Sequence, residues 1–165
     1  MKKKALSAFV IVLLFLSFKG PDAFAGKDSI KDKIKSASGF LLDRSSSCEQ
    51  MQEALGDLLE ASVHLMPQAD YADEAKGKIE KAKRAILEDS IVSGEGRMML
   101  EEAYALMNSG DSYTFPEEIE SIENAVEYGK KLVDSIFLSL EKEDGGSAAI
   151  RLLEMVIMVV TPIHQ

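Results

Sequence analysis

The 165-residue chain contains no tryptophan, one cysteine and two histidines. A single cysteine, Cys48, cannot form a disulfide within the chain, so a packed core must hold the fold together. Two histidines are few for a metal centre or for acid–base catalysis. The sequence also lacks a Gly-rich phosphate loop, a complete calcium loop, a zinc-binding spacing and a nucleophile elbow. The sequence motifs of the common enzyme and cofactor classes are therefore missing.

The first 25 residues have the form of a secretory signal peptide. Three lysines at positions 2–4 precede an apolar run from Ala5 to Phe18, and Ala23 and Ala25 put small residues at the places that precede cleavage. We expect cleavage after Ala25 and a periplasmic or secreted mature protein. An uncleaved anchor is the alternative, but the apolar run is shorter than the roughly 20 residues that a membrane-spanning helix needs.

Charge restricts the partners of the mature chain. The whole sequence has 28 acidic and 19 basic residues, a formal net charge of −9 at pH 7. Removing residues 1–25 takes away four lysines and one aspartate, which brings the net charge to about −12. Nucleic acids and anionic membrane surfaces bind clustered Lys and Arg, so we expect neither as a partner after cleavage. A basic protein, a cation or a neutral ligand is compatible with this charge.

Apolar residues recur at steps of three and four through most of the mature chain, and strand-like alternation is missing. This spacing predicts an all-α protein, an elongated up-and-down helical bundle of four main helices in a single domain, residues 26–165. The first two helices, 30–65 and 70–107, are expected to be long and kinked. Their weak points are the serines at 45–47 and the glycines at 94 and 96. The other two helices are expected at 117–141 and 148–160.

Capping patterns predict where these helices begin and end. Thr114 stands three residues before Glu117, the spacing of a capping box, and the glycines at 145–146 are expected to end that helix. Ser46 and Glu49 have the same spacing, which favours a fresh helix start within the first arm.

The last predicted helix, 148–160 with Ser147 as its cap, is apolar nearly all round. It is too short to span a bilayer, so it is either the most buried helix of the bundle or an oligomer interface. Cys48 is expected to be a buried thiol, or else an exposed one that joins two chains by a disulfide. The residues predicted for an interface are Cys48, Met155, Val156 and Val159.

Gly129 is unusual because it stands in the middle of a seam of bulky apolar residues. A glycine inside a helix costs about 1 kcal/mol relative to alanine, so its presence indicates either a close helix approach or a hollow. If there is a hollow, a small apolar ligand could bind there, lined by Tyr128, Met99 and Met107.

Metal or haem binding has little support in the sequence. Glu60 and His64 lie one helical turn apart, a spacing that suits a metal ligand with its orienting carboxylate, proton transfer, or a surface ion pair. Met51 and His164 could hold haem between them, but the Glu-x-x-His pattern of di-iron bundles is missing. We expect no cofactor.

These observations favour a non-catalytic interaction or structural module of the bacterial envelope. It would contact a protein partner, or a second copy of itself, through the last helix. A periplasmic bundle that binds haem, a metal or a small apolar molecule is the alternative. An enzyme that uses Glu60 and His64 is a third hypothesis.

Overall fold

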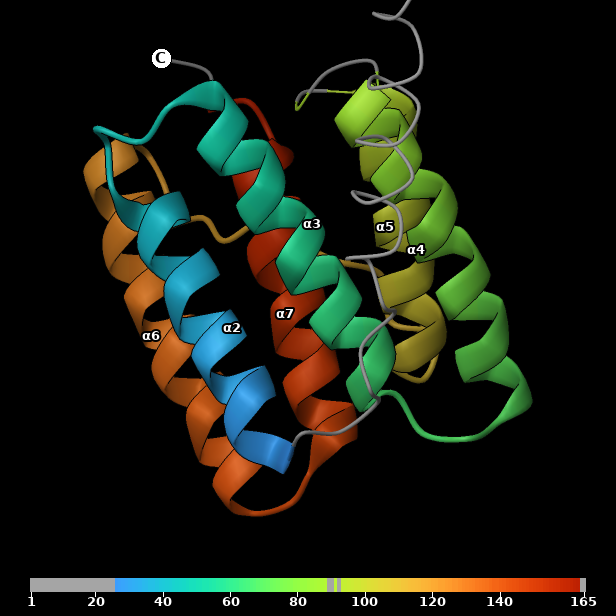
Figure 1. Cartoon of the computed structure of the whole chain (residues 1–165). Coiled ribbons are helices and arrows are strands. Elements are labelled where there is room, and N and C mark those ends of the chain that lie inside the picture. The colour runs from blue at the N-terminus through green and yellow to red at the C-terminus, as the bar shows by residue number, and fades with distance from the viewer. Residues whose placement is uncertain (1–25, 89–90, 92, 164–165) are drawn as a thin grey trace, which may run out of the picture. The chain divides into compact units, whose positions relative to one another are not determined.

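A computed structural model describes residues 26–88, 91 and 93–163, so the predicted signal peptide lies outside the described residues. The bundle is the compact unit formed by residues 31–165. Within the described residues the structure is all-helical and has no strand. The helices are α2 (Gly26–Leu42), α3 (Cys48–Leu65), α4 (Asp70–Glu88), α5 (Gly94–Met107), α6 (Ile122–Glu141) and α7 (Gly145–Val160) (Figure 1).

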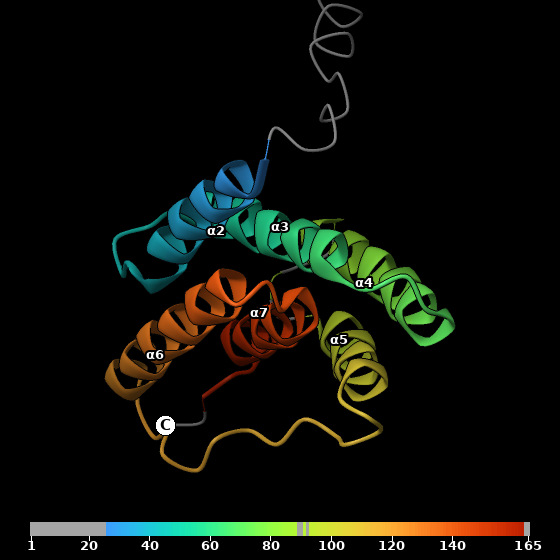
Figure 2. The same ribbon diagram turned by 90° about the horizontal axis from the view of Figure 1, so that it is seen from below.

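The helices of the bundle form two layers. Figure 2 shows α2, α3 and α4 in one layer and α6, α7 and α5 in the other, with α7 in the middle of its layer. Successive helices run in opposite directions except α5 and α6, which are parallel and are joined by the long loop 108–121 (Figure 1). Ser38 of α2 reaches the sulfur of Met155 at 4.0 Å, so α2 packs across the layers onto α7.

The centre of the core is α7, whose sequence is apolar nearly all round, so the first of the two alternatives for this helix is correct. The side chains of Leu152, Leu153 and Ile157 have no exposed surface, and burying each contributes about 1.5–3 kcal/mol. Met155 and Val156 are equally buried, so the prediction that they form a surface interface is wrong. Within the described residues we find no helix with the length and apolar character of a membrane span.

The prediction of four main helices is also wrong, because the first arm breaks where a kink was expected and the second breaks where a break or a kink was expected. The first arm ends at Leu42, after which the Asp43 carboxylate accepts hydrogen bonds from the backbone and hydroxyl of Ser45 at 2.9 and 2.8 Å. Ser47 and Gln50 then form the capping box of α3, one position later than predicted. Such side-chain bonds to the backbone compete with helix continuation.

The second arm breaks between α4 and α5. The side chain of Ser93 caps α5 by accepting from the backbone N–H of Gly96 at 3.1 Å. The break therefore lies at the glycine-containing segment that the sequence marks as weak, and a new cap makes it a helix start.

The predicted boundaries of 117–141 and 148–160 need correction. Residues 117–121 are not helical, and α6 begins at Ile122 with Ser121 as its cap. Gly145 begins α7 instead of ending α6, and the cap is Asp144, which accepts from the Ser147 backbone at 3.0 Å. Thr114 therefore does not cap a helix at Glu117.

Gly145 marks the closest approach between α7 and the end of α3. A Cβ atom added there would lie 2.7 Å from the backbone carbonyl oxygen of Leu65, whereas one added at Gly146 would lie 3.7 Å from the Asp144 carboxylate. A backbone atom cannot move aside as a side chain can. The space at Gly145 therefore needs the smallest residue.

We expect Gly145→Ala to destabilise the bundle by about 1–3 kcal/mol, because the added methyl group overpacks this contact. Gly146→Ala is the matched control, and alanine's helix propensity should leave it neutral or up to about 1 kcal/mol more stable. Urea unfolding followed by circular dichroism measures both. Equal midpoints for the two variants would contradict the close approach.

The cap of α7 should make the stability of the bundle depend on pH in the acidic range. Hydrogen bonds from the hydroxyl and the backbone of Ser147 lower the pKa of Asp144, so its contribution is complete above about pH 4 and is lost as the pH falls through the folded-state pKa. Asp144→Asn keeps an oxygen acceptor but does not titrate. Between pH 6 and pH 2, wild type should lose more stability than this variant. Asp134→Asn on α6 is the control and should follow wild type.

Candidate functional site

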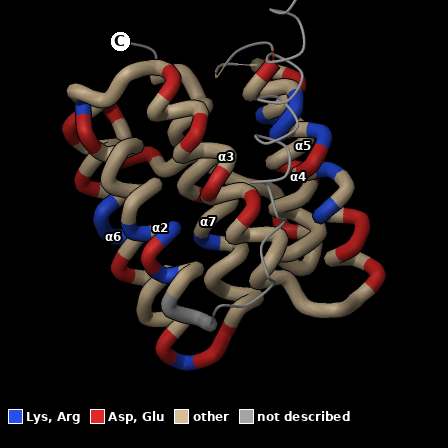
Figure 3. Tube along the Cα trace, in the orientation of Figure 1, with Lys and Arg blue, Asp and Glu red and all other residues tan. Residues whose placement is uncertain are grey.

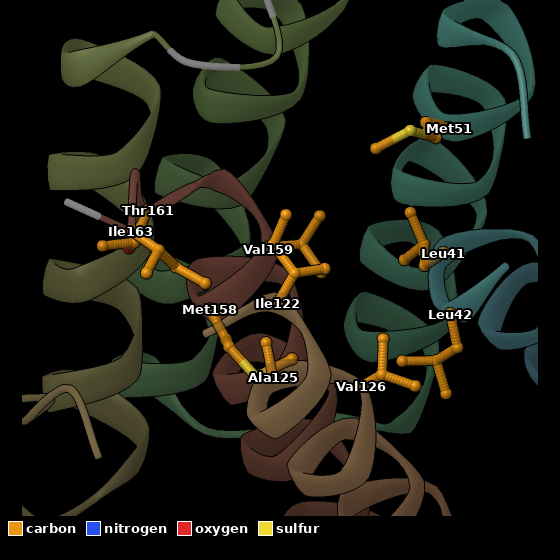
Figure 4. Close-up of a pocket in the computed structure, with 10 residues that line it drawn as sticks. All are labelled: Leu41, Leu42, Met51, Ile122, Ala125, Val126, Met158, Val159, Thr161 and Ile163. Atoms are coloured by element: carbon orange, nitrogen blue, oxygen red, sulfur yellow. The ribbon is translucent and has the colours of Figure 1, made fainter. Parts of the chain in front are cut away.

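An apolar groove with a volume of about 550 Å³ opens where the end of α2 and the start of α3 meet the start of α6 and the end of α7. In Figure 4, Leu41, Leu42 and Met51 stand on one side, facing Val126 and Val159 from α6 and α7 on the other. The ten lining residues are Leu41, Leu42, Met51, Ile122, Ala125, Val126, Met158, Val159, Thr161 and Ile163. Thr161 is the one with a hydroxyl, and this donates to the Ile157 carbonyl at 2.6 Å.

Most of these apolar side chains are in contact with solvent. Ile122, the first residue of α6, is 45% exposed, and Met51, Val126 and Val159 are half-buried. Met158, only 4% exposed, is the most buried of the lining side chains. Apolar surface gathered in a concave site, unlike scattered exposed leucines, is typical of a binding surface.

Gly129 does not open a hollow. A Cβ atom added there would lie 2.5 Å from a terminal methyl of Leu42 and 3.5 Å from the methyl of Met158, so these side chains already fill the space. The close-approach interpretation is correct, and the ligand site predicted at Gly129 is not found. Because Leu42 and Met158 line the groove, Gly129 supports the groove from behind.

The other residues predicted for the ligand site lie elsewhere. Tyr128 contacts Glu154, Met99 is half-buried on α5, and Met107 is buried at the end of the same helix. None of the three lines the groove.

Two of the predicted interface residues lie at or next to the groove. Val159 lines it, and Cys48 is exposed at the first residue of α3, one turn before the lining residue Met51. The expectation of a buried thiol is therefore wrong, because the arm breaks just before Cys48 and leaves it on the first turn. A disulfide between chains stays a prediction.

Glu60 and His64 lie one helical turn apart on α3, but the described residues place with them no third His, Cys, Asp or Glu that would complete a metal site. Among the described residues, no group of three or more His, Cys, Asp and Glu side chains could hold a metal ion. The Glu60 carboxylate lies 3.4 Å from the ammonium of Lys33, and His64 is exposed further along α3. Met51 lines the apolar groove, and His164 lies outside the described residues.

A polar cluster, separate from the apolar groove, lies between α6 and α7. The sequence did not predict it. Glu154, 6% exposed, accepts a hydrogen bond from the Tyr128 hydroxyl at 2.7 Å and one from Arg151 at 2.8 Å, so both carboxylate oxygens are used. The i,i+3 pair of Arg151 and Glu154 on an otherwise apolar helix is the signal that could have revealed it.

Aromatic residues surround this carboxylate. The Tyr113 ring, from loop 108–121, packs edge-on against the Tyr104 ring with the centroids 5.5 Å apart. Burial, and then the negative charge of Glu154, raise the pKa values of Tyr113 and Tyr128, so both phenols stay neutral at pH 7. The Tyr113 hydroxyl is buried with no hydrogen-bond partner. The Tyr113–Tyr104 contact packs the loop against α5, and the Tyr128–Glu154 hydrogen bond joins α6 to α7.

The two phenols should respond differently to loss of the hydroxyl group. Tyr128→Phe leaves a buried carboxylate oxygen without its donor, so we expect a loss of about 1–3 kcal/mol. Tyr113→Phe removes a hydroxyl that has no partner, and should be neutral or stabilising. Thermal and urea unfolding of both variants test this. A larger loss for Tyr113→Phe would show that the hydroxyl of Tyr113 has an acceptor in solution.

No family model, curated protein or solved structure matches this chain. Its function has to be inferred from the groove and from the chemistry of the residues around it.

Proposed function

We propose that this protein is an exported, non-catalytic binding module of the bacterial envelope and that the apolar groove is its binding surface for a protein partner. Export is supported by the lysines, apolar run and small residues of positions 1–25. The observation that carries the binding role is the groove itself, which collects apolar side chains from α2, α3, α6 and α7 at one place on the bundle.

The lining chemistry favours binding over catalysis at this site. None of the ten lining residues has an acid, a base or a cysteine side chain, and the Thr161 hydroxyl is held by its own helix. A partner that covers the groove gains about 25 cal/mol for each Å² of apolar surface removed from water. Exposed Ile122 and half-buried Met51 and Val159 are the side chains with most to gain.

A small apolar molecule is the second candidate occupant. The groove volume of about 550 Å³ falls within the roughly 300–1,000 Å³ of small-molecule sites. Haem or a metal ion is less well supported, because the donors in the lining are the thioethers of Met51 and Met158 and one hydroxyl already in use.

Substitution on α6 tests the groove directly. We expect the mature chain to bind a neutral apolar fluorophore such as N-phenyl-1-naphthylamine, and Ile122→Ser to weaken that binding about fivefold or more, since Ile122 lines the groove. Leu138→Ser is the matched control, because Leu138 is 51% exposed on the same helix but does not line the groove. Fluorescence titration measures both. No binding, or equal weakening by both substitutions, would count against the groove.

Native mass spectrometry of untagged mature protein, taken from its own compartment, separates the two occupants. Bound organic mass that is lost in Ile122→Ser supports the small-molecule alternative. A mass without ligand supports the protein partner.

A further inference from the structure

We infer that the occupant of the groove is a basic amphipathic helix of a partner protein, which places apolar side chains in the groove and Lys or Arg side chains against its rim. This inference rests on the proposed function and adds the chemical class of the partner. Three features of the groove support it: the charge of its rim, the missing backbone partners in its lining, and its two methionines.

The rim of the groove is acidic. We define the rim by sequence, as the exposed charged residues within two positions of a lining residue. On α3, Glu49 and Glu53 stand two positions from Met51 and point away from it, so they add charge to this end of the bundle and not to the groove wall. Arg44 is the one Lys or Arg in this set among the described residues, and it is paired with Glu123. Figure 3 shows acidic positions on the first turns of α3 and around the start of α6, with one acidic and one basic position in the α2–α3 connection, whereas basic positions gather on α4. The rim carboxylates are Asp43, Glu49, Glu53, Glu120, Glu123 and Glu127.

The negative charge of the rim favours a positively charged partner. Unpaired carboxylates beside an apolar groove attract cations and repel anionic surfaces, so this side of the bundle disfavours an acidic protein or an anionic lipid surface. The Arg44–Glu123 and Lys130–Glu127 pairs neutralise part of the rim. Among the described residues, Asp43, Glu49, Glu53 and Glu120 have no ion pair with a basic side chain.

The apolar lining favours a helical partner over an extended one. An extended peptide in the groove would leave backbone N–H and C=O groups without partners, because the side chains there are apolar and the Thr161 hydroxyl is already used. The described residues also contain no strand edge to which such a peptide could pair. A helix satisfies its own backbone bonds and presents apolar residues at i, i+3, i+4 and i+7 on one face.

Methionines widen the range of acceptable helices. Met51 and Met158, from α3 and α7, both line the groove, and the unbranched, polarisable thioether adapts to differently shaped apolar neighbours. Methionine-rich grooves suit helices that are read by their amphipathic pattern, without one fixed sequence.

The test uses an 18-residue peptide with leucines at i, i+3, i+4 and i+7, lysines on the other face, and one tryptophan. Because the chain has no tryptophan, the peptide's fluorescence reports binding without background. The controls are a peptide with glutamates in place of the lysines and a scrambled lysine peptide. We expect the first peptide to become helical on binding the mature chain, to bind about tenfold or more tightly than either control, and to weaken as NaCl rises from 50 to 500 mM.

Two sets of variants locate the binding site. Ile122→Ser should weaken binding of the lysine peptide, and Leu138→Ser should leave this binding unchanged. Changing Glu49, Glu53 and Glu120 together to Gln should weaken binding of the lysine peptide about threefold or more and reduce the salt dependence of this binding. The control changes exposed carboxylates away from the groove, namely Glu80, Glu88 and Glu141, to Gln.

The outcomes separate this inference from the function on which it rests. If the neutral fluorophore binds but the lysine peptide binds no better than its controls, the basic helix is overturned and a groove for apolar molecules stands. If neither binds, both proposals fall. Equal weakening by the rim and control triple variants overturns the role of the rim. A stable dimer that the peptide does not displace assigns the groove to a second copy and overturns the inference.

Discussion

The structure depends on the burial of α7. Its apolar residues point in every direction, so it can be stable in water only when other helices cover all of its sides. This requirement explains why α3, α5 and α6 surround it and why α2 closes over it through Ser38. Glu154 is the one charged residue buried in the described part of the chain, and Tyr128 and Arg151 satisfy both of its oxygens. The same helix therefore explains both the core and the polar cluster beside it.

The two ends of α7 differ in how closely other residues pack against them. At its start, Asp144 caps the helix and Gly145 lies against the Leu65 carbonyl, which leaves no room for another residue. At its end, Val159 lines an open groove together with residues from three other helices. Val159 is half-buried there, between Met158 and Val160, which are buried. We propose that a partner covers this exposed apolar surface.

Some candidate residues were predicted for reasons other than their place in the structure. Met51 entered as a metal ligand and Val159 as an interface residue, yet both line the groove. Gly129 was correctly recognised as unusual, but whether its missing side chain leaves a hollow depends on Leu42, far away in the sequence. The Arg151–Glu154 pair could have indicated a polar cluster on α7, but its partner Tyr128 and the nearby Tyr113 are distant in sequence, so local spacing does not identify them.

The sequence by itself determined the all-helical class, the apolar faces, the weak points of both arms and the apolar character of the last helix, whose burial the tertiary structure decided. These features depend on 3.6-residue periodicity and on caps that join residues three or four positions apart. Only the tertiary structure decided that the weak points become breaks, that Ser121 and Asp144 are the caps used, and that Leu42, Met51, Ile122 and Val159 meet at one groove. The reason is distance along the chain: contacts such as Ser38–Met155, 117 positions apart, follow from how the helices pack, and local patterns carry no record of that packing.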